Sequence, residues 1–207
     1  MTHTLHRQGT RENLSRDYPI LAMAAHGINE RGAGSKLGKF LEICWRHGAV
    51  NLGDIKQGSV FTYDAEQICK NVSDTTCVQC VFDDINKLGA ALRELKEADL
   101  GMSVVVSGLI DRVGECCQKV GLQIHSMDQS LGVWGKTELL PGKEVLEITT
   151  MCGHAMVATN LVEKMIEDIK KGKTTPEKAA KKLAKTCECG IFNPNRAAEL
   201  LTRAAVQ

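Results

Sequence analysis

Three cysteines and one histidine are the residues of this chain best suited to chemistry. Cys152 is followed two positions later by His154, and Cys187 is separated from Cys189 by one residue. A thiolate is both a nucleophile and a soft metal ligand, and imidazole is a base and a ligand. The grouping therefore indicates metal or redox chemistry, without naming a reaction.

The position of Cys152 suggests how its thiol would be activated. Residues 144–150 alternate polar and apolar side chains, as a half-buried strand does, and an amphipathic helix is expected over 155–171. Cys152 would then lie between the end of a strand and the start of a helix. The free N–H groups and the dipole of a helix N-terminus lower the pKa of a nearby thiol. Cys152 is thus a candidate ligand or nucleophile, with His154 as its base.

A shared metal centre is the first hypothesis for these residues. Cys152, Cys187 and Cys189 would supply three ligands, and His154 or the C-x₂-C pair Cys77 and Cys80 would supply a fourth. All these candidates but one are thiolates, and their spacings depart from the usual zinc ribbon. An iron–sulfur cluster is therefore favoured over zinc. With only three fixed thiolates, one metal position stays open for substrate, which would make the centre catalytic.

Two alternatives remain open. In a metal-free thiol or redox enzyme, Cys152 would be the nucleophile, His154 or His125 its base, and Cys187 or Cys189 the resolving thiol.

In a non-catalytic assembly module, the chain would instead bind a small anion at its glycine-rich loop. The residues that could cradle a phosphate or carboxylate there are Gly32, Gly34, Ser35 and Lys36. The remaining cysteines are expected to fill the core: Cys44, Cys69, Cys116 and Cys117.

Composition limits the classes of protein that fit. The chain has 207 residues, 43% hydrophobic and 25% charged, with a formal net charge of +1. This balance argues against a general nucleic-acid binder and leaves a small-molecule or anionic substrate, or assembly into a homo-oligomer, as compatible partners. No apolar run approaches the roughly 20 residues that span a bilayer. The N-terminus lacks a signal-peptide pattern, so we expect a cytoplasmic protein with reduced thiols.

The periodicity of apolar residues predicts an α+β fold. Residues 18–24, 59–63 and 102–106 are expected to form strands, as are 122–127 and 144–150. Helices are expected after Ser35, from Asp83 or Asp84, over 107–119 and 155–171, and after the caps Thr175 and Asn193. The order over 102–171 resembles most of a ferredoxin-like split β-α-β unit in a mixed sheet. A polar arm (1–17), an α/β domain (18–171) and a helical segment packed on it (172–207) complete the expected organisation.

Overall fold

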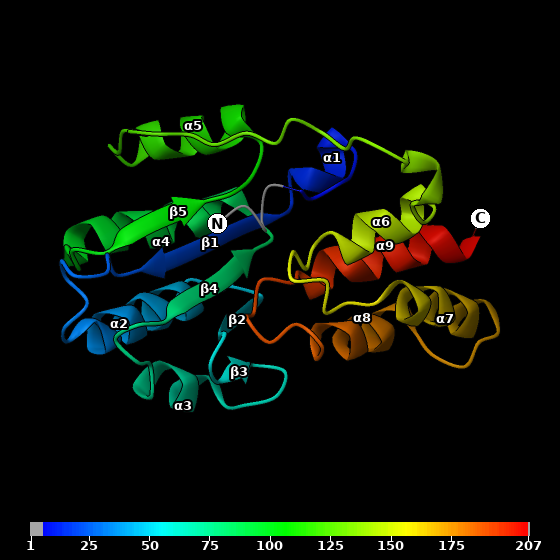
Figure 1. Ribbon diagram of the computed structural model, residues 1–207, viewed down its shortest axis with the longest axis horizontal. Helices are drawn as coiled ribbons and strands as arrows, with labels where there is room; N and C mark the ends of the chain where they lie inside the picture. Colours follow the sequence, from blue (N-terminus) through cyan, green and yellow to red (C-terminus); the bar gives the residue numbers. More distant parts are fainter. Residues whose placement is uncertain (1–5, 207) are drawn as a thin grey trace.

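A five-stranded antiparallel sheet forms one half of the molecule, and helices form the other. The computed structural model describes residues 6–206. The strands are β1 (Tyr18–Met23), β2 (Asn51–Asp54), β3 (Gly58–Ser59), β4 (Cys77–Phe82) and β5 (Ser103–Val106), in the order β3-β2-β4-β1-β5 (Figure 1). All the strand pairs of this sheet are antiparallel. The expectation of a mixed sheet is therefore wrong. The α+β class is confirmed.

The first hydrophobic cluster lies between the sheet and its helices. Helices α2 (Ala33–Arg46) and α4 (Ile85–Ala98) pack on the sheet, α3 (Ala65–Lys70) packs on α2, and α5 (Ile110–Lys119) packs on α4. Ile20 on β1 lies opposite Cys80 on β4, and both are fully buried in this cluster. The chain order β1-α2-β2-β4-α4-β5 with this strand order is compatible with a ferredoxin-like split β-α-β arrangement. It occupies residues 18–106, earlier in the chain than expected.

The second hydrophobic cluster lies within the helical half. It is built by α6 (Lys143–Thr149), α7 (Thr159–Lys170), α8 (Pro176–Ala184) and α9 (Pro194–Val206). Both predicted caps are present: Thr175 accepts a hydrogen bond from the backbone of Lys178, and Asn193 accepts one from that of Arg196. Their side chains satisfy N–H groups that a helix start otherwise leaves unpaired.

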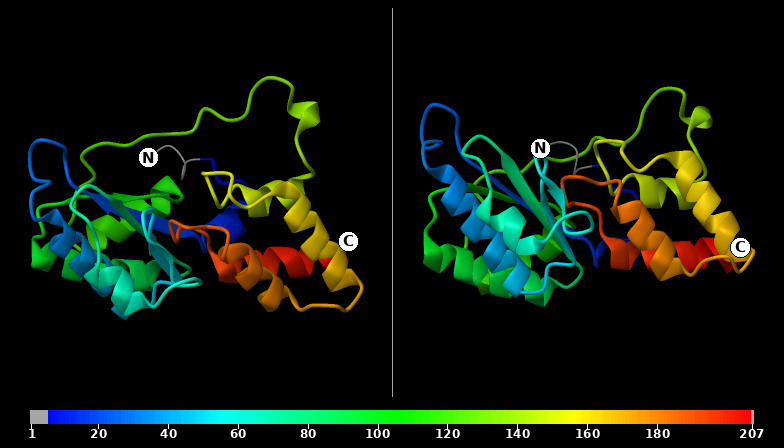
Figure 2. Two further views of the ribbon diagram at one scale, coloured as in Figure 1. Left: turned by 60° about the horizontal axis from the view of Figure 1, so that its bottom comes forward. Right: turned by 90° about the horizontal axis from the view of Figure 1, so that it is seen from below.

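Two other segments connect these halves. A long connector, residues 121–142, crosses from α5 to α6 with only a short 3₁₀ turn at Thr137–Leu139, and Figure 2 shows it passing over both halves. The N-terminal arm contains the short helix α1 (Arg11–Leu14) before entering β1.

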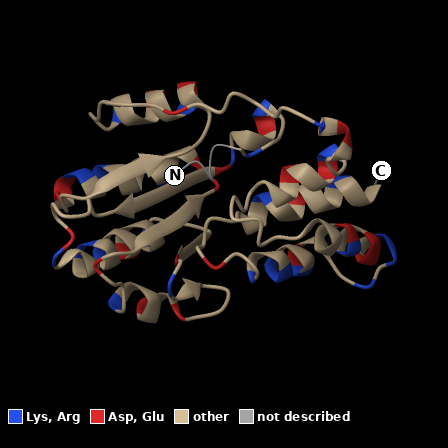
Figure 3. Ribbon diagram, in the orientation of Figure 1, with Lys and Arg blue, Asp and Glu red and all other residues tan. Residues whose placement is uncertain are grey.

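Lys, Arg, Asp and Glu are interspersed across both halves, in keeping with the small net charge (Figure 3). No helix within residues 6–206 is long and apolar enough to cross a membrane.

Several predicted elements are wrong. Residues 144–150 lie mainly in helix α6, because Val145 and Ile148 share one helical face that is buried in the second cluster. Residues 122–127 have no regular structure, and the strand expected over 59–63 ends at Ser59. Helix α2 begins at Ala33 with Gly32 as its cap, before Ser35.

Candidate functional site

Two connections between helices, one after α6 and one from α8 to α9, bring the predicted cysteines together. Cys152 lies in the turn after α6, Cys187 in the turn after α8, and Cys189 just before α9. The backbone N–H of Cys152 donates to Thr149 O at 3.0 Å, and that of Cys187 donates to Ala184 O at 3.1 Å. Both bonds continue the helical turn beyond the helix end, so the two sulfurs are positioned by helix C-termini.

The side chains form a continuous row of contacts. The thiols of Cys152 and Cys187 share a hydrogen bond. The Sγ atoms of Cys187 and Cys189 lie 3.8 Å apart, and Cys189 Sγ lies 3.5 Å from Nδ1 of His154. The residues that sequence spacing grouped are therefore neighbours in space, in the order Cys152, Cys187, Cys189, His154.

The row has a buried end and a solvent-facing end. Cys152, Cys187 and Cys189 are at most 2% exposed, whereas Gly153 to Met156 are all exposed. His154 is thus the member of the row that solvent and solutes reach. A ligand or substrate approaching the three sulfurs would enter on the His154 side.

The protein environment favours the protonated thiols of Cys152 and Cys187. The pKa of Cys152 is raised, first by its hydrogen bond with Cys187 and then by burial, although the N–H groups of His154 and Met156 oppose this. The bond with Cys152 lowers the pKa of Cys187, but contact with Cys189 and burial outweigh it and bring that pKa to about 12. Clustered thiols resist ionisation because each thiolate would face another sulfur in a medium of low polarity.

This finding corrects the expected activation of Cys152. Helix α7 begins only at Thr159, so Cys152 follows the C-terminus of α6 and does not sit at a helix start. The negative end of a helix dipole does not stabilise a thiolate. The structural reason for expecting a nucleophilic Cys152 is therefore absent.

Contacts from distant segments fix the cysteine turns. Gly190 has φ +76°, and a Cβ there would lie 2.1 Å from the carbonyl carbon of Leu52 in β2. Arg7 donates from Nη2 to Ile191 O at 2.5 Å, and the backbone N–H of Gln8 donates to Thr150 Oγ1 at 3.0 Å. The arm and the sheet thus hold the backbone on either side of the row. Sequence reasoning missed Arg7 and Gln8, since no local pattern marks a contact with residues so far along the chain.

The C-x₂-C pair lies in the sheet. Cys80 belongs to the first hydrophobic cluster, where it contacts Cys44, and Cys77 begins β4 opposite Met23. Cys152, Cys187 and Cys189 belong to the second cluster. The structure therefore does not bring Cys77 or Cys80 to the row. Cys44, Cys69, Cys116 and Cys117 are buried, as expected of core residues.

The glycine-rich loop binds a side chain of the protein itself, the carboxylate of Asp74. The N–H groups of Gly32 and Gly34 donate to the two carboxylate oxygens of Asp74, at 2.9 and 2.8 Å. These bonds, that of Gly34 first, lower the pKa of Asp74. Ser35 donates to Gly32 O, and Lys36 is exposed. The donors that were expected to bind a small anion are thus used to anchor this loop.

The row as it stands is not a formed metal cage. Within residues 6–206, no group of three or more His, Cys, Asp or Glu side chains is arranged so that it could hold a metal ion.

Compared with protein-family models, with curated proteins and with solved structures, the chain matches none of them.

Proposed function

We propose that this chain is a cysteine-ligated metalloprotein whose centre is bound by Cys152, Cys187 and Cys189, with His154 as the fourth ligand. The observation that carries the proposal is the continuous contact of these four side chains, which come from two separate connections, one after α6 and one after α8. Thiolate and imidazole are the ligands that zinc and iron accept most readily.

Two of the separations in the row match those of neighbouring donors on one metal ion. Two sulfurs on one tetrahedral zinc, each about 2.3 Å from it, are roughly 3.7 Å apart. The Cys187–Cys189 separation is 3.8 Å, and the Cys189–His154 separation is 3.5 Å. Because the four donors form a row, binding requires the side chains of Cys152 and His154 to turn toward a common point. The exposed turn of residues 153–156 gives His154 room to do so.

The raised thiol pKa values also support a metal role. Buried thiols whose pKa is raised by burial and by a neighbouring sulfur gain from a cation, because the metal replaces their protons and removes the repulsion between thiolates. The same pKa shifts disfavour a metal-free thiol enzyme, since a nucleophile must ionise near neutral pH. All nine cysteines are free thiols, which supports a reducing compartment such as the cytoplasm.

The sulfur contacts favour a single ion over an iron–sulfur cluster. In a cubane cluster each cysteine ligates a different iron, so the sulfurs are separated by the cluster itself. A cluster here would require the three cysteine side chains to move apart. When bound, the ion would supply Lewis acidity, or electron transfer if it is iron. Three buried thiols would hold it, and the exposed His154 would be the ligand that a small anionic substrate displaces.

The test is metal and acid-labile sulfide analysis of protein purified without oxygen. We expect about one zinc or iron per chain without sulfide, and loss of that metal in Cys152→Ala, Cys187→Ala and Cys189→Ala. Cys116→Ala, a buried cysteine in the other half, is the matched control and should retain it.

Iron with equimolar sulfide, lost in the same variants, would keep the metalloprotein but replace the single ion with a cluster. Wild-type protein that takes up neither metal, even after incubation with zinc or ferrous iron, would overturn the proposal. Rapid alkylation of Cys152 would then favour the thiol enzyme.

A further inference from the structure

Lysines gather on α8 and on the loop that precedes it. Residues 170–185 contain seven of the 26 lysines and arginines of the chain but only one of its 25 acidic residues, so this segment has a net charge of +6. The rest of the chain therefore has a net charge of −5. Within a surface that is otherwise mixed, Figure 3 shows this concentration of basic residues on α8 and on the loop that joins α7 to it.

The lysines of α8 lie along one side of the helix. Four residues with the spacing i, i+3, i+4 and i+7 make up this lysine stripe: Lys178, Lys181, Lys182 and Lys185. This spacing places side chains next to one another on a helix surface, and all four residues are exposed. The apolar side of α8, which includes Leu183, is buried in the second hydrophobic cluster. The lysine stripe is thus the outer surface of this helix.

The protein does not balance the charges of the lysine stripe. Within residues 6–206, none of its four lysines forms an ion pair with an acidic side chain. On the neighbouring α7, by contrast, two lysines pair with acidic residues four positions away: Lys164 with Asp168 and Lys171 with Glu167. Glu177, the one acidic residue of the segment, is hydrogen-bonded to Thr175 at the start of α8. The stripe therefore presents unneutralised positive charge to solvent.

This arrangement is unfavourable for the isolated chain. The members of the lysine stripe are like-charge neighbours at i, i+3 and i, i+4, and such pairs destabilise a helix. The dipole of α8 favours Lys181 and Lys182 in its last turn, but it disfavours Lys178 in its first turn. Helix capping therefore does not account for the whole stripe. An anionic partner that covers the stripe would remove the repulsion.

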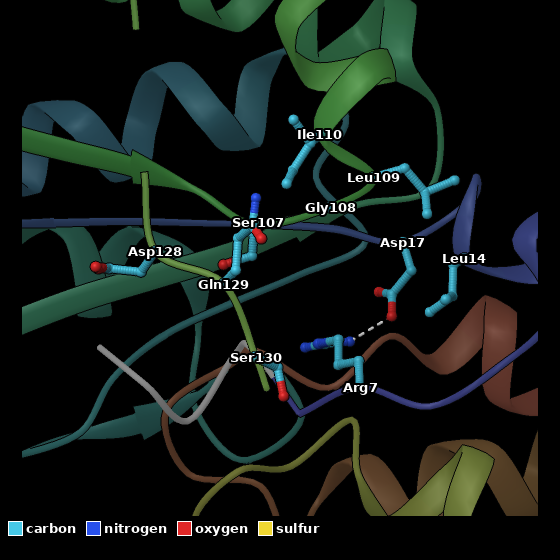
Figure 4. Close-up of a pocket in the computed structure, with 10 residues that line it drawn as sticks. All are labelled: Arg7, Leu14, Asp17, Ser107, Gly108, Leu109, Ile110, Asp128, Gln129 and Ser130. Carbon is cyan, nitrogen blue, oxygen red and sulfur yellow. Dashed lines mark hydrogen bonds and ion pairs between the residues drawn. The ribbon is translucent and has the colours of Figure 1, made fainter. Parts of the chain in front are cut away.

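Several arginines elsewhere in the molecule are paired with carboxylates. Figure 4 shows one case, where Arg7 donates to Asp17 beside a cavity of about 270 Å³ that is also lined by Asp128. With two carboxylates and one guanidinium, this cavity does not attract an anion. Three arginines on the surface also pair with acidic side chains: Arg11, Arg16 and Arg46. An anion therefore gains more at the lysine stripe than at these sites.

We propose that the lysine stripe docks an acidic protein, through a helix that carries carboxylates at the same spacing. The stripe extends over about two helical turns, roughly 10 Å, which matches one face of such a helix. No helix within residues 6–206 has more than two acidic residues at this spacing, so a second copy of the chain does not supply the complement. Because the stripe ends two residues before Cys187, the docked partner would lie beside the cysteine row.

Two other classes of anionic partner fit this surface less well. Nucleic-acid surfaces combine positive charge with arginine forks and with aromatic rings that stack on bases, and residues 170–185 contain neither arginine nor an aromatic residue. A helix that lies on a membrane inserts its apolar face, but the apolar face of α8 is buried in the second hydrophobic cluster. Docking of an acidic protein requires only complementary charges, which the stripe presents.

Fluorescence anisotropy with a labelled acidic peptide tests this surface. The probe is an alanine-based peptide of about 15 residues, long enough to be partly helical on its own, with Glu at positions i, i+3, i+4 and i+7. The same peptide with Gln at these positions is its control. We expect saturable binding of the Glu peptide alone. Binding should weaken severalfold as the salt concentration rises from about 0.05 to 0.15 M, because salt screens exposed charges.

Replacing the stripe separates the local surface from the net charge. One variant combines four substitutions: Lys178→Gln, Lys181→Gln, Lys182→Gln and Lys185→Gln. It should bind the Glu peptide about tenfold more weakly, because each exposed charge pair contributes a small increment. Glutamine is nearly as good a helix former as lysine, so α8 should be retained.

The matched control removes the same charge elsewhere. It combines four substitutions of exposed lysines outside the segment: Lys36→Gln, Lys119→Gln, Lys136→Gln and Lys143→Gln. This variant has the same net charge as the stripe variant and should bind the Glu peptide as the wild type does. Equal loss of binding in the two variants would overturn the proposal, since net charge alone would then explain it. So would a wild-type protein that binds the Glu and Gln peptides alike.

The same variants distinguish the other anionic partners. Vesicles containing phosphatidylserine and a double-stranded RNA of about 16 base pairs serve as comparison ligands. We expect both to bind the wild type more weakly than the Glu peptide does. Tighter binding of either one, lost in the stripe variant and kept in its control, would overturn the proposal and assign the stripe to a membrane or a nucleic acid.

Discussion

Cys187 and Cys189 hold their Sγ atoms 3.8 Å apart in a buried turn between α8 and α9. A disulfide would need about 2.05 Å, so the contact joins two reduced thiols. Gly190, in the left-handed region, lets the chain turn back directly after the second cysteine. The backbone thus presents two soft donors, both screened from water, to one point.

Metal should stabilise the folded chain through this pair. A ligand that binds only the native state adds about 2.7 kcal/mol at a free concentration 100 times its dissociation constant. For a chain of this size, that predicts a rise in Tm of roughly 5–10 °C when zinc is added to metal-free protein. Calorimetry should show this rise for the wild type and for Cys116→Ser, but not for Cys187→Ser.

The metal-free protein should lose stability as the pH rises above 9. The pKa of Cys187 is about 12 in the folded chain against an ordinary value of 9.0, so between these values the unfolded thiol ionises while the folded one stays protonated. The unfolded state then binds fewer protons, and the free energy of unfolding falls with increasing pH.

Urea unfolding at pH 8 and pH 10, in the presence of a chelator, measures this effect. The wild type should lose about 1 kcal/mol more than Cys187→Ser between the two pH values, since the serine does not titrate. Equal losses in both proteins would contradict the raised pKa. Lysine and tyrosine titrations are common to both proteins and cancel in the comparison.

Gly190→Ala should be far more damaging than Gly172→Ala. Both glycines have positive φ, 76° and 67°, so both substitutions incur the backbone strain of about 1–2 kcal/mol. A Cβ at Gly190 would also lie 2.1 Å from the carbonyl carbon of Leu52 and 2.2 Å from Gly53 N, whereas a Cβ at Gly172 would meet no atom within 4 Å among residues 6–206, its own chain neighbours aside. Chemical denaturation should show an additional loss of at least about 2 kcal/mol at Gly190.

Metal uptake by the glycine variants gives an independent readout. If the contact between Gly190 and β2 positions Cys189, the Gly190→Ala protein should also bind zinc more weakly, while Gly172→Ala should bind it normally. Comparable stability and zinc affinity in the two variants would show that the Gly190 contact is not needed to form the site.

The sequence predicted the grouping of Cys152, Cys187 and Cys189, and it left the fourth member open among His154, Cys77 and Cys80. Local composition was sufficient because these residues share rare chemistry and adjoin helix ends. The pattern of residues 144–150 misled, since its apolar positions fit a strand and a helix alike, and only packing on the helical half decides between them. The expected activation of Cys152 is wrong for the same reason, because it assumed that a strand ends and a helix begins at this residue.

The other differences come from contacts between distant residues. Asp74 anchors the N–H groups of Gly32 and Gly34 from 40 residues or more along the chain, and no local signal marks it as their partner. Cys77 and Cys80 have a ligand-like spacing, yet β4 places them in the sheet half. Caps such as Thr175 were predictable because their partners lie within one turn.

Asp17→Asn should destabilise the folded chain strongly, although it changes only one charge. Asp17 accepts from Arg7 at 2.6 Å and from Arg196 at 2.7 Å, and its carboxylate also accepts from Asn193 at 3.2 Å. Removing its charge leaves two buried guanidinium groups facing each other without a carboxylate between them. Breaking a buried ion pair from one side costs about 3–5 kcal/mol.

Asp111→Asn is the matched control for this change. Asp111 also pairs with an arginine of the N-terminal arm, Arg11, but both side chains are at least half exposed. Its loss should therefore change the free energy of unfolding by no more than about 1 kcal/mol. Because Arg7 also contacts Ile191 beside the cysteine turn, Asp17→Asn should weaken zinc binding as well, whereas Asp111→Asn should not. A similar cost for both substitutions in urea unfolding would show that the buried pairs do not hold the arm to the helical half.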